Sequence, residues 1–385
     1  MKKENQFDFS LSPFIVIWEV TQACDLACIH CRAKARPWRD PGELTTEEGY
    51  SLIDEIKKFG GVWGSDQEGG LRNRSPLLVF TGGDPVKRED LYDLIRYGVS
   101  RGLRTTVSPS VTPLLTKEAI RKFKESGISR MAISLDGAEP DIHDSFRGVN
   151  GSYEWTLRAI RDCVEEKIPI QINTTVTRYN FENLEEIAYL IRNFENVVLW
   201  SVFFLVPTGR GKKDDQISPE EYEAAFHDMY ELSKTMPYDI KSTEAPHYRR
   251  LFIQRALEES RRGEQPVVRD RVKVRWSDTI GRASRGINDG NGFVFISHTG
   301  EVYPSGFLPI SAGNVKQKSL VDIYRNSPLF RELRDYSKLK GKCGVCEFRK
   351  ICGGSRARAF AMTGDYMESE PNCVYIPKNS KTDYS

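Results

Sequence analysis

Apolar positions in this chain alternate between short continuous runs and longer amphipathic stretches. The run at 14–20 predicts a buried strand, and the capping pattern Thr45-Thr46-Glu47-Glu48 predicts a helix that ends near residue 59. The alternation continues with strands predicted at 76–80, 103–108, 130–135, 168–176 and 197–205, and helices at 88–101, 116–126, 152–166 and 182–194. This spacing is typical of parallel βα units. Six such units are fewer than the eight of a closed TIM barrel, so we predict an α/β fold with a partial (βα)6 TIM-like barrel.

The pattern changes after residue 210. A helix is predicted at 218–235, a hairpin at 292–297 and 301–303, and a helix at 319–335, whereas 60–76 and the arginine-rich 241–290 are predicted to be loop-like or irregular. We therefore predict three parts: a barrel domain at 1–210, a connecting region at 211–290 and a C-terminal domain at 291–385.

Composition excludes several classes of protein. The 385 residues carry a net charge of +2, so no overall field favours nucleic acid. No apolar run is long enough to cross a bilayer, and the first residues lack the apolar core of a signal peptide. We expect a cytoplasmic protein that binds neither nucleic acid nor membrane.

The eight cysteines point to chemistry. Three lie near the start of the chain, four near its end, and Cys163 stands alone in a helical pattern, where we expect a small buried residue. In a reducing compartment, such clusters indicate metal binding rather than disulfides.

The first cluster has the spacing C-x3-C-x2-C, formed by Cys24, Cys28 and Cys31. Three thiolates suit a [4Fe–4S] cluster in which one iron has no protein ligand. Thiolates also bind zinc, but a structural zinc site needs a fourth ligand, for which His30 is the only nearby candidate. Zinc at this site is the less favoured alternative.

This segment, directly after the first strand, resembles the signature of the radical S-adenosylmethionine (SAM) superfamily. The resemblance implies that Cys24, Cys28 and Cys31 bind a catalytic [4Fe–4S] cluster, whose open iron takes SAM. It also implies reductive cleavage of SAM to a 5′-deoxyadenosyl radical that abstracts a hydrogen atom. An electron donor such as ferredoxin or flavodoxin is then expected as a partner.

A second motif strengthens the resemblance. Thr81-Gly82-Gly83-Asp84-Pro85 closes the second long strand and is similar to the family's GGE segment, which holds the SAM amino group. Asp84 replaces the commoner Glu but keeps the charge. By the same resemblance, further SAM contacts are expected from three residues at or near strand ends: Ser134, Arg147 and Asn173. For Asn173, which lies in the fifth predicted strand, the alternative role is barrel packing or helix capping.

The last four cysteines supply a complete ligand set for a [4Fe–4S] cluster or a zinc ion: Cys343, Cys346, Cys352 and Cys373. The tract from Cys352 to Ala359 resembles the SPASM-type extension, which carries auxiliary iron–sulfur clusters. Ser305 stands where that extension commonly has another cysteine. We therefore expect one auxiliary cluster, and two [4Fe–4S] clusters in all, together with SAM.

The substrate is less determined. The C-terminal tract resembles the branch of alternative haem and haem d1 synthesis enzymes, which implies a tetrapyrrole substrate whose acidic side chains are removed or altered. The arginine-rich stretch 249–285 would suit carboxylate recognition. A maturase of a ribosomal peptide, a protein or a metal cofactor is the alternative, and a non-catalytic zinc-binding protein is an alternative of another class. Three residues are candidates for a base or radical relay: Asp136, Tyr303 and Tyr366.

Overall fold

A computed structural model describes most of the chain, namely residues 8–60, 62–65, 71–73, 75–264, 286–378 and 380. Internal contacts group the chain into two units, each built from segments that are discontinuous in sequence. The first unit comprises Met1–Asp25, Ala33–Ala132 and Asp278–Arg334. The second comprises Leu26–Arg32, Ile133–Ser277 and Asp335–Ser385. The predicted boundaries near 210 and 290 stay a prediction.

The first unit contains a mixed sheet with the strand order β12-β11-β10-β1-β4-β5-β6. Strand β1 pairs in parallel with both β4 and β10, and β4, β5 and β6 continue in parallel. The hairpin strands β10 and β11 are antiparallel, as predicted. The strands are β1 (Ile15–Glu19), β4 (Leu77–Thr81), β5 (Arg104–Val107), β6 (Arg130–Ser134), β10 (Phe293–Ile296), β11 (Glu301–Tyr303) and β12 (Gly313–Asn314).

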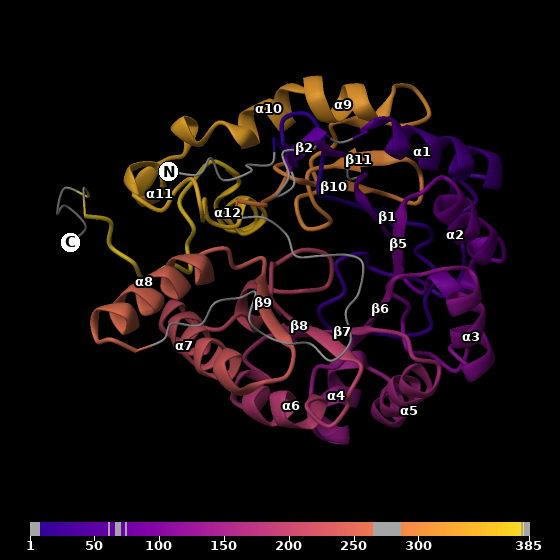
Figure 1. Ribbon diagram of the computed structural model, residues 1–385, viewed down its shortest axis with the longest axis horizontal. Coiled ribbons are helices and arrows are strands. Elements are labelled where there is room, and N and C mark those ends of the chain that lie inside the picture. The colour runs from indigo at the N-terminus through magenta and orange to yellow at the C-terminus, as the bar shows by residue number, and fades with distance from the viewer. Residues whose placement is uncertain are drawn as a thin grey trace. The chain divides into compact units, whose positions relative to one another are not determined.

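Three helices connect the parallel strands of this unit and follow one another along one side of β1 and β5 (Figure 1): α1 (Thr46–Lys58), α2 (Leu91–Ser100) and α3 (Lys117–Glu125). Thr45 caps α1 through the predicted capping box with Glu48. The helix predicted at 319–335 is two helices, α9 (Leu320–Asn326) and α10 (Pro328–Arg334), because Pro328 cannot continue the first.

The two faces of strand β1 differ in burial: one is fully buried and the other is partly exposed. Trp18 is fully buried, packs against Phe80 at 5.9 Å between ring centroids, and lies so close to Gly49 of α1 that a Cβ there would come within 2.8 Å. Ile15 and Ile17 lie on the opposite face and pack, partly exposed, against Leu77 and Val79 of β4.

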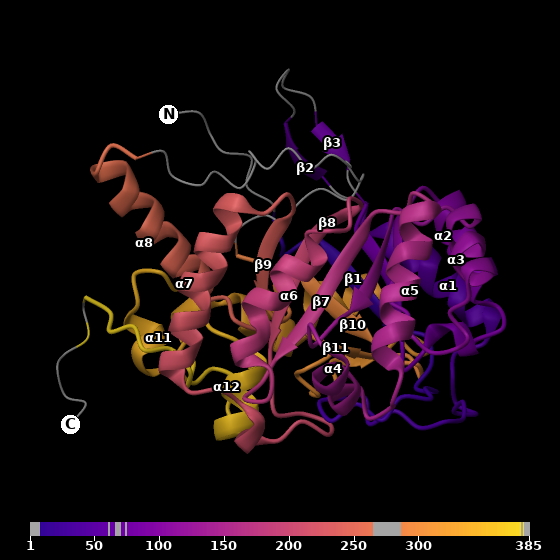
Figure 2. The same cartoon turned by 90° about the horizontal axis from the view of Figure 1, so that it is seen from below.

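The second unit contains the parallel strands β7 (Ile170–Val176), β8 (Val197–Phe204) and β9 (Asp239–Thr243). Figure 2 shows α6 (Leu184–Ile191) and α7 (Pro219–Thr235) beside these strands. The remaining helices of this unit are α4 (Pro140–Arg147), α5 (Ser152–Glu165), α8 (Tyr248–Arg261), α11 (Gly341–Val345) and α12 (Arg356–Thr363).

Two of the segments predicted to lack regular structure contain it. Within 60–76, β2 (Val62–Ser65) and β3 (Leu71–Asn73) pair antiparallel, so the loop prediction was wrong. Within 241–290, α8 is a 14-residue helix. It escaped prediction because few of its positions are apolar and buried, so its periodicity is weak. None of the described helices is long and apolar enough to cross a membrane.

Candidate functional site

The first cysteine segment lies against the predicted Gly-Gly motif in the first unit. The Gly83 amide donates to the Thr21 carbonyl at 2.8 Å, and the Asp84 amide donates to the Ala23 carbonyl at 2.6 Å. A Cβ at Gly83 would come within 2.5 Å of the Ala23 carbonyl oxygen, and one at Gly82 within 2.7 Å of that of Thr21. Only glycine allows this approach, so the motif fixes the backbone that leads into Cys24.

Asp84 is a fully buried member of this motif. Its carboxylate accepts hydrogen bonds from the Thr112 hydroxyl at 2.8 Å and the Val86 amide at 3.2 Å. Burial raises the pKa of Asp84 from 3.8 to about 6, although these hydrogen bonds oppose the shift. The carboxylate is therefore held inside the first unit, and its contact with SAM stays a prediction.

The pH dependence of stability in the Asp84→Asn variant tests whether the Asp84 carboxylate is buried as described. Because the folded-state pKa lies above 3.8, the native protein binds more protons between about pH 4 and pH 6, and stability falls as pH rises through that window. Asparagine removes the charge, so we expect the variant to be more stable than the wild type at pH 7.5, by up to about 3 kcal/mol. The difference should shrink to about 1 kcal/mol at pH 4.5 and disappear only below about pH 3.8, where the carboxyl is protonated in both states. Thermal unfolding at both pH values measures it, and a variant less stable than the wild type at pH 7.5 would contradict the account.

Ser110 connects Cys24 to the glycine motif and was missed by sequence reasoning. Its hydroxyl donates to the Gly83 carbonyl at 2.6 Å and lies 3.4 Å from the Cys24 sulfur. The available signal was its position just after the predicted strand at 103–108, next to the strand that carries the glycines.

Cys28 and Cys31 belong to the second unit, in the segment Leu26–Arg32. The Arg210 amide donates to the Cys31 carbonyl at 2.9 Å, and its Nε donates to the Cys28 carbonyl at 2.8 Å. Arg210 also lines a pocket of about 770 Å³ together with Ile29 and Phe146. Arg210 therefore holds the backbone of both cysteines, a role that the sequence did not reveal.

Arg147, at the end of α4, contacts both Cys28 and Asp136. Its guanidinium lies 3.8 Å from the Cys28 sulfur and forms an ion pair with the buried Asp136 carboxylate, which also accepts from the Thr175 amide at 2.7 Å. Burial raises the pKa of the Cys28 thiol, and Arg147 opposes this by favouring the thiolate. Asp136 is thus placed to orient Arg147.

The other two predicted SAM contacts lie on neighbouring parts of the fold, one at the end of a strand and one inside a strand. Ser134 is the last residue of β6, and Asn173 lies within β7, where its side-chain oxygen accepts from Gln171 at 2.7 Å. His30 packs on Phe146 with ring centroids 4.5 Å apart, and burial lowers its pKa, so its ring is neutral. The SAM-binding roles of Ser134, Arg147 and Asn173 stay predictions.

The four C-terminal cysteines line one cavity in the second unit: Cys343, Cys346, Cys352 and Cys373. Backbone amides lie near three of the sulfurs, from Glu370 to Cys343 at 3.3 Å, from Phe348 to Cys346 at 3.4 Å and from Gly354 to Cys352 at 3.4 Å. Among the described residues, no three His, Cys, Asp or Glu side chains are arranged so that they could hold a single metal ion. Four thiols with amide donors fit the ligand set of a [4Fe–4S] cluster.

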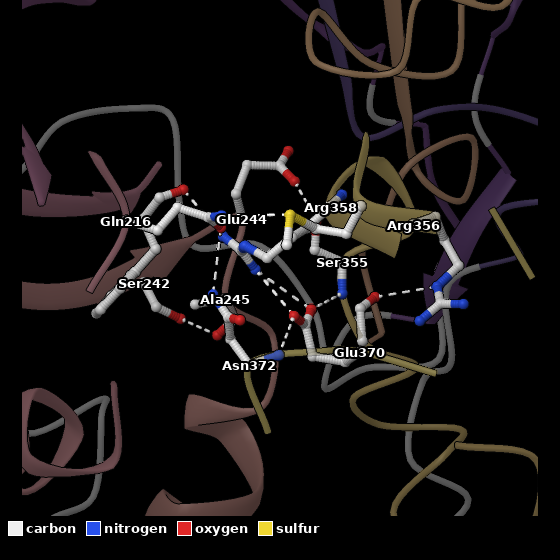
Figure 3. A network of polar contacts seen from close by, with 12 residues as sticks. Gln216, Ser242, Glu244, Ala245, Ser355, Arg356, Arg358, Glu370 and Asn372 are labelled. Carbon is white, nitrogen blue, oxygen red and sulfur yellow. Dashed lines mark hydrogen bonds and ion pairs between the residues drawn. The ribbon is translucent and has the colours of Figure 1, made fainter. Parts of the chain in front are cut away.

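A buried ionic network holds the segment that follows Cys352 and the segment that precedes Cys373 (Figure 3). Arg358 is fully buried, pairs with Glu370 at 3.2 Å and donates to the Phe204 carbonyl at the end of β8 at 3.0 Å. The Ser355 amide donates to Glu370 at 2.8 Å. The arginines of the tract 352–359 are therefore structural, since they hold the segments that carry the cysteines.

Cys163 is fully buried in α5, as predicted, and burial raises the pKa of its thiol. We expect Cys163→Ser to leave the iron content unchanged, because the four C-terminal cysteines complete their own set. Iron analysis of the anaerobically purified variant checks this. A loss of about four irons per chain would show that an auxiliary ligand was misassigned.

The arginine-rich stretch is only partly described. Arg250 pairs with Glu223 and Arg255 with Glu231, while Arg249 donates to the Ile351 carbonyl at 3.0 Å. Because these three side chains already bind groups of the protein itself, the structure gives no support to the expectation that they recognise carboxylates of a substrate. Five arginines lie outside the described residues: Arg269, Arg271, Arg275, Arg282 and Arg285.

Comparison with known families gives two matches. Residues 18–191 match the model of the Radical SAM superfamily, and residues 288–347 match the SPASM model, an iron-sulfur cluster-binding domain. The second match includes Cys343 and Cys346 but ends before Cys352 and Cys373.

Comparison with individual proteins extends these matches over the chain. The chain is 40% identical to the "AdoMet-dependent heme synthase" of Methanosarcina barkeri, covering 95% of this chain and 97% of that protein. It is 42% identical to the protein of the same name from Nitratidesulfovibrio vulgaris, covering 94% and 93%. Among solved structures, Streptococcus suis SuiB bound to S-adenosylmethionine is similar with a TM-score of 0.67, at 15% identity, over 94% of this chain and 78% of that one. The predicted α/β partial-barrel fold with a C-terminal extension is confirmed.

Proposed function

The chain belongs to the radical SAM superfamily, and from this premise we propose that it is a haem synthase that oxidatively decarboxylates propionate side chains of an iron porphyrin. The observation that carries the proposal is the 40–42% identity, over nearly the full length of both chains, to proteins named as AdoMet-dependent haem synthases. Membership of the superfamily makes the protein an enzyme that uses SAM and a [4Fe–4S] cluster, and the SPASM domain adds auxiliary iron–sulfur binding.

The residues around the first cysteine segment fit this cofactor. Cys24, Cys28 and Cys31 would hold the cluster, whose chemistry is the one-electron cleavage of SAM to methionine and a 5′-deoxyadenosyl radical. Arg147 beside Cys28 stabilises thiolate and offers a guanidinium to the SAM carboxylate. The Gly82–Gly83 backbone packs closely against the segment that leads into the first cysteine and so positions it.

The first unit offers a surface for a flat apolar substrate. Ile15 and Ile17 are partly exposed on one face of β1, whereas their neighbours Leu77 and Val79 on β4 and Phe295 on β10 are buried. A porphyrin macrocycle would bury apolar area against such a wall, at about 25 cal/mol per Å².

The proposed reaction balances with one SAM for each side chain. Removal of a hydrogen atom from the carbon next to the ring, followed by loss of CO2 and of one electron, converts a propionate to a vinyl group. The other products are 5′-deoxyadenosine and methionine, and the electron released equals the electron consumed. The family requires a reductant, and we propose ferredoxin or flavodoxin as the donor.

The test is incubation of the reconstituted enzyme with SAM, dithionite and iron coproporphyrin III without oxygen. The expected products lack one CO2 and two hydrogens for each side chain converted, as read by mass spectrometry. The matched control is the Arg147→Met variant, which should retain its iron but convert little substrate. Unchanged porphyrin in the presence of active SAM cleavage would reject this substrate and favour the alternative, a peptide or cofactor maturase.

A further inference from the structure

Two polar side chains of α8 line the same cavity as the four C-terminal cysteines. His247 is the N-cap of this helix, and Arg250 follows three residues later on the same side. Sequence reasoning assigned no role to His247 and placed Arg250 only within the arginine-rich stretch, and neither residue takes part in the SAM chemistry described above.

His247 is buried, with 1% of its surface exposed, and neither ring nitrogen has a hydrogen-bond partner in the described part of the chain. Its ring is fixed by aromatic contacts, stacked on Tyr222 at 5.6 Å and edge-on to Phe226 at 4.7 Å. Burial lowers the pKa of His247 to about 4, so the ring is neutral and presents one N–H donor and one acceptor.

Arg250 is also buried, and only some of its N–H donors have acceptors. Its two terminal nitrogens donate to the Glu223 carboxylate at 2.6 and 2.5 Å, which neutralises its charge. Its Nε–H has no partner among the described residues. A buried donor without an acceptor costs about 1–3 kcal/mol, so two of them at one cavity indicate that the cavity normally contains an acceptor.

Sulfur is the acceptor that this cavity implies. Backbone amides already point at three of the cysteine sulfurs, and hydrogen bonds to the sulfurs of a cluster are a main determinant of its reduction potential. We propose that His247 and Arg250 donate hydrogen bonds to the sulfur atoms of the auxiliary cluster and thereby raise its reduction potential. The inference rests on the auxiliary cluster and not on the porphyrin substrate, so it stands for a peptide substrate as well.

The test measures the auxiliary cluster alone, in full-length protein whose Cys24, Cys28 and Cys31 are alanine. A potentiometric titration followed by electron paramagnetic resonance compares His247→Phe with the control His227→Phe, which changes an exposed histidine of α7. We expect His247→Phe to keep its iron and shift to a more negative potential, and His227→Phe to show no shift. His247→Gln retains an N–H donor, so its auxiliary cluster should have a reduction potential close to that of the protein with His247.

Nitrogen hyperfine coupling in protein labelled with ¹⁵N-histidine provides a second readout that does not depend on the His247→Phe variant. A weak coupling to the reduced auxiliary cluster, absent in His247→Gln, supports a hydrogen bond even if His247→Phe fails to retain iron. A strong coupling typical of a coordinated imidazole, no coupling at all, or an unchanged potential in His247→Phe would each overturn the proposal.

Discussion

Replacement of Cys24, Cys28 and Cys31 together by alanine is expected to abolish SAM cleavage while leaving the second cluster in place. The three thiols are the only ligands that the protein offers to the first cluster in this account, and the one-electron cleavage of SAM depends on that cluster. The four C-terminal thiols line a separate cavity with its own amide donors, so they do not depend on the first set. The measurement is 5′-deoxyadenosine formation with dithionite, together with iron content.

The matched control is Cys163→Ala, which removes a buried thiol outside both sets. We expect that variant to form 5′-deoxyadenosine as the wild type does, and the triple variant to retain about four of about eight irons per chain. Undiminished 5′-deoxyadenosine formation by the triple variant would falsify the assignment of these cysteines.

Arg358→Met is expected to cause the largest loss of stability. Arg358 and Glu370 are both fully buried, and the arginine also donates to the carbonyls of Phe204 and Leu205. Burial would raise the pKa of Glu370, but the Arg358 cation keeps it below its usual value. Removing the cation leaves a buried carboxylate uncompensated, which costs about 3–5 kcal/mol. Denaturant unfolding of the full-length protein, together with its iron content, measures the effect.

Two controls separate the ion pair from a general effect of losing an arginine. Arg161→Met changes an exposed arginine of α5 and should alter stability by less than about 0.5 kcal/mol. The double variant Arg358→Met with Glu370→Gln should recover part of the loss, because no charge then remains buried. A loss in the double variant equal to the sum of the two single losses would show that the pair is not coupled.

The sequence predicted most of what depends on local pattern. The parallel strands from β1 to β8 follow from short apolar runs separated by amphipathic helices, and the structure bears them out. Cysteine spacing and the Gly82–Gly83 motif predicted the family, because each places a chemically unusual residue type at the end of a strand. Each of these two signals consists of a few consecutive residues, so it can be recognised without knowledge of the tertiary structure.

What the sequence could not predict depends on contacts between distant segments. Ser110 lies beside Cys24 only because β5 pairs with β4, and its position after a predicted strand was the one signal that the sequence offered for it. The arginine tract after Cys352 suggested substrate or cluster chemistry, yet Arg358 is a buried structural cation because β8 and Glu370 surround it. His247 is the N-cap of α8, a helix that the sequence did not predict because few of its positions are apolar. The position of His247 at the cysteine cavity therefore depends on tertiary contacts.

The most direct test of the central claim is the yield of 5′-deoxyadenosine from anaerobically reconstituted wild-type protein, with and without iron coproporphyrin III. We predict that the porphyrin stimulates 5′-deoxyadenosine formation and that one molecule is formed for each propionate converted to a vinyl group. SAM cleavage that is unaffected by the porphyrin, with every propionate intact, would contradict the account.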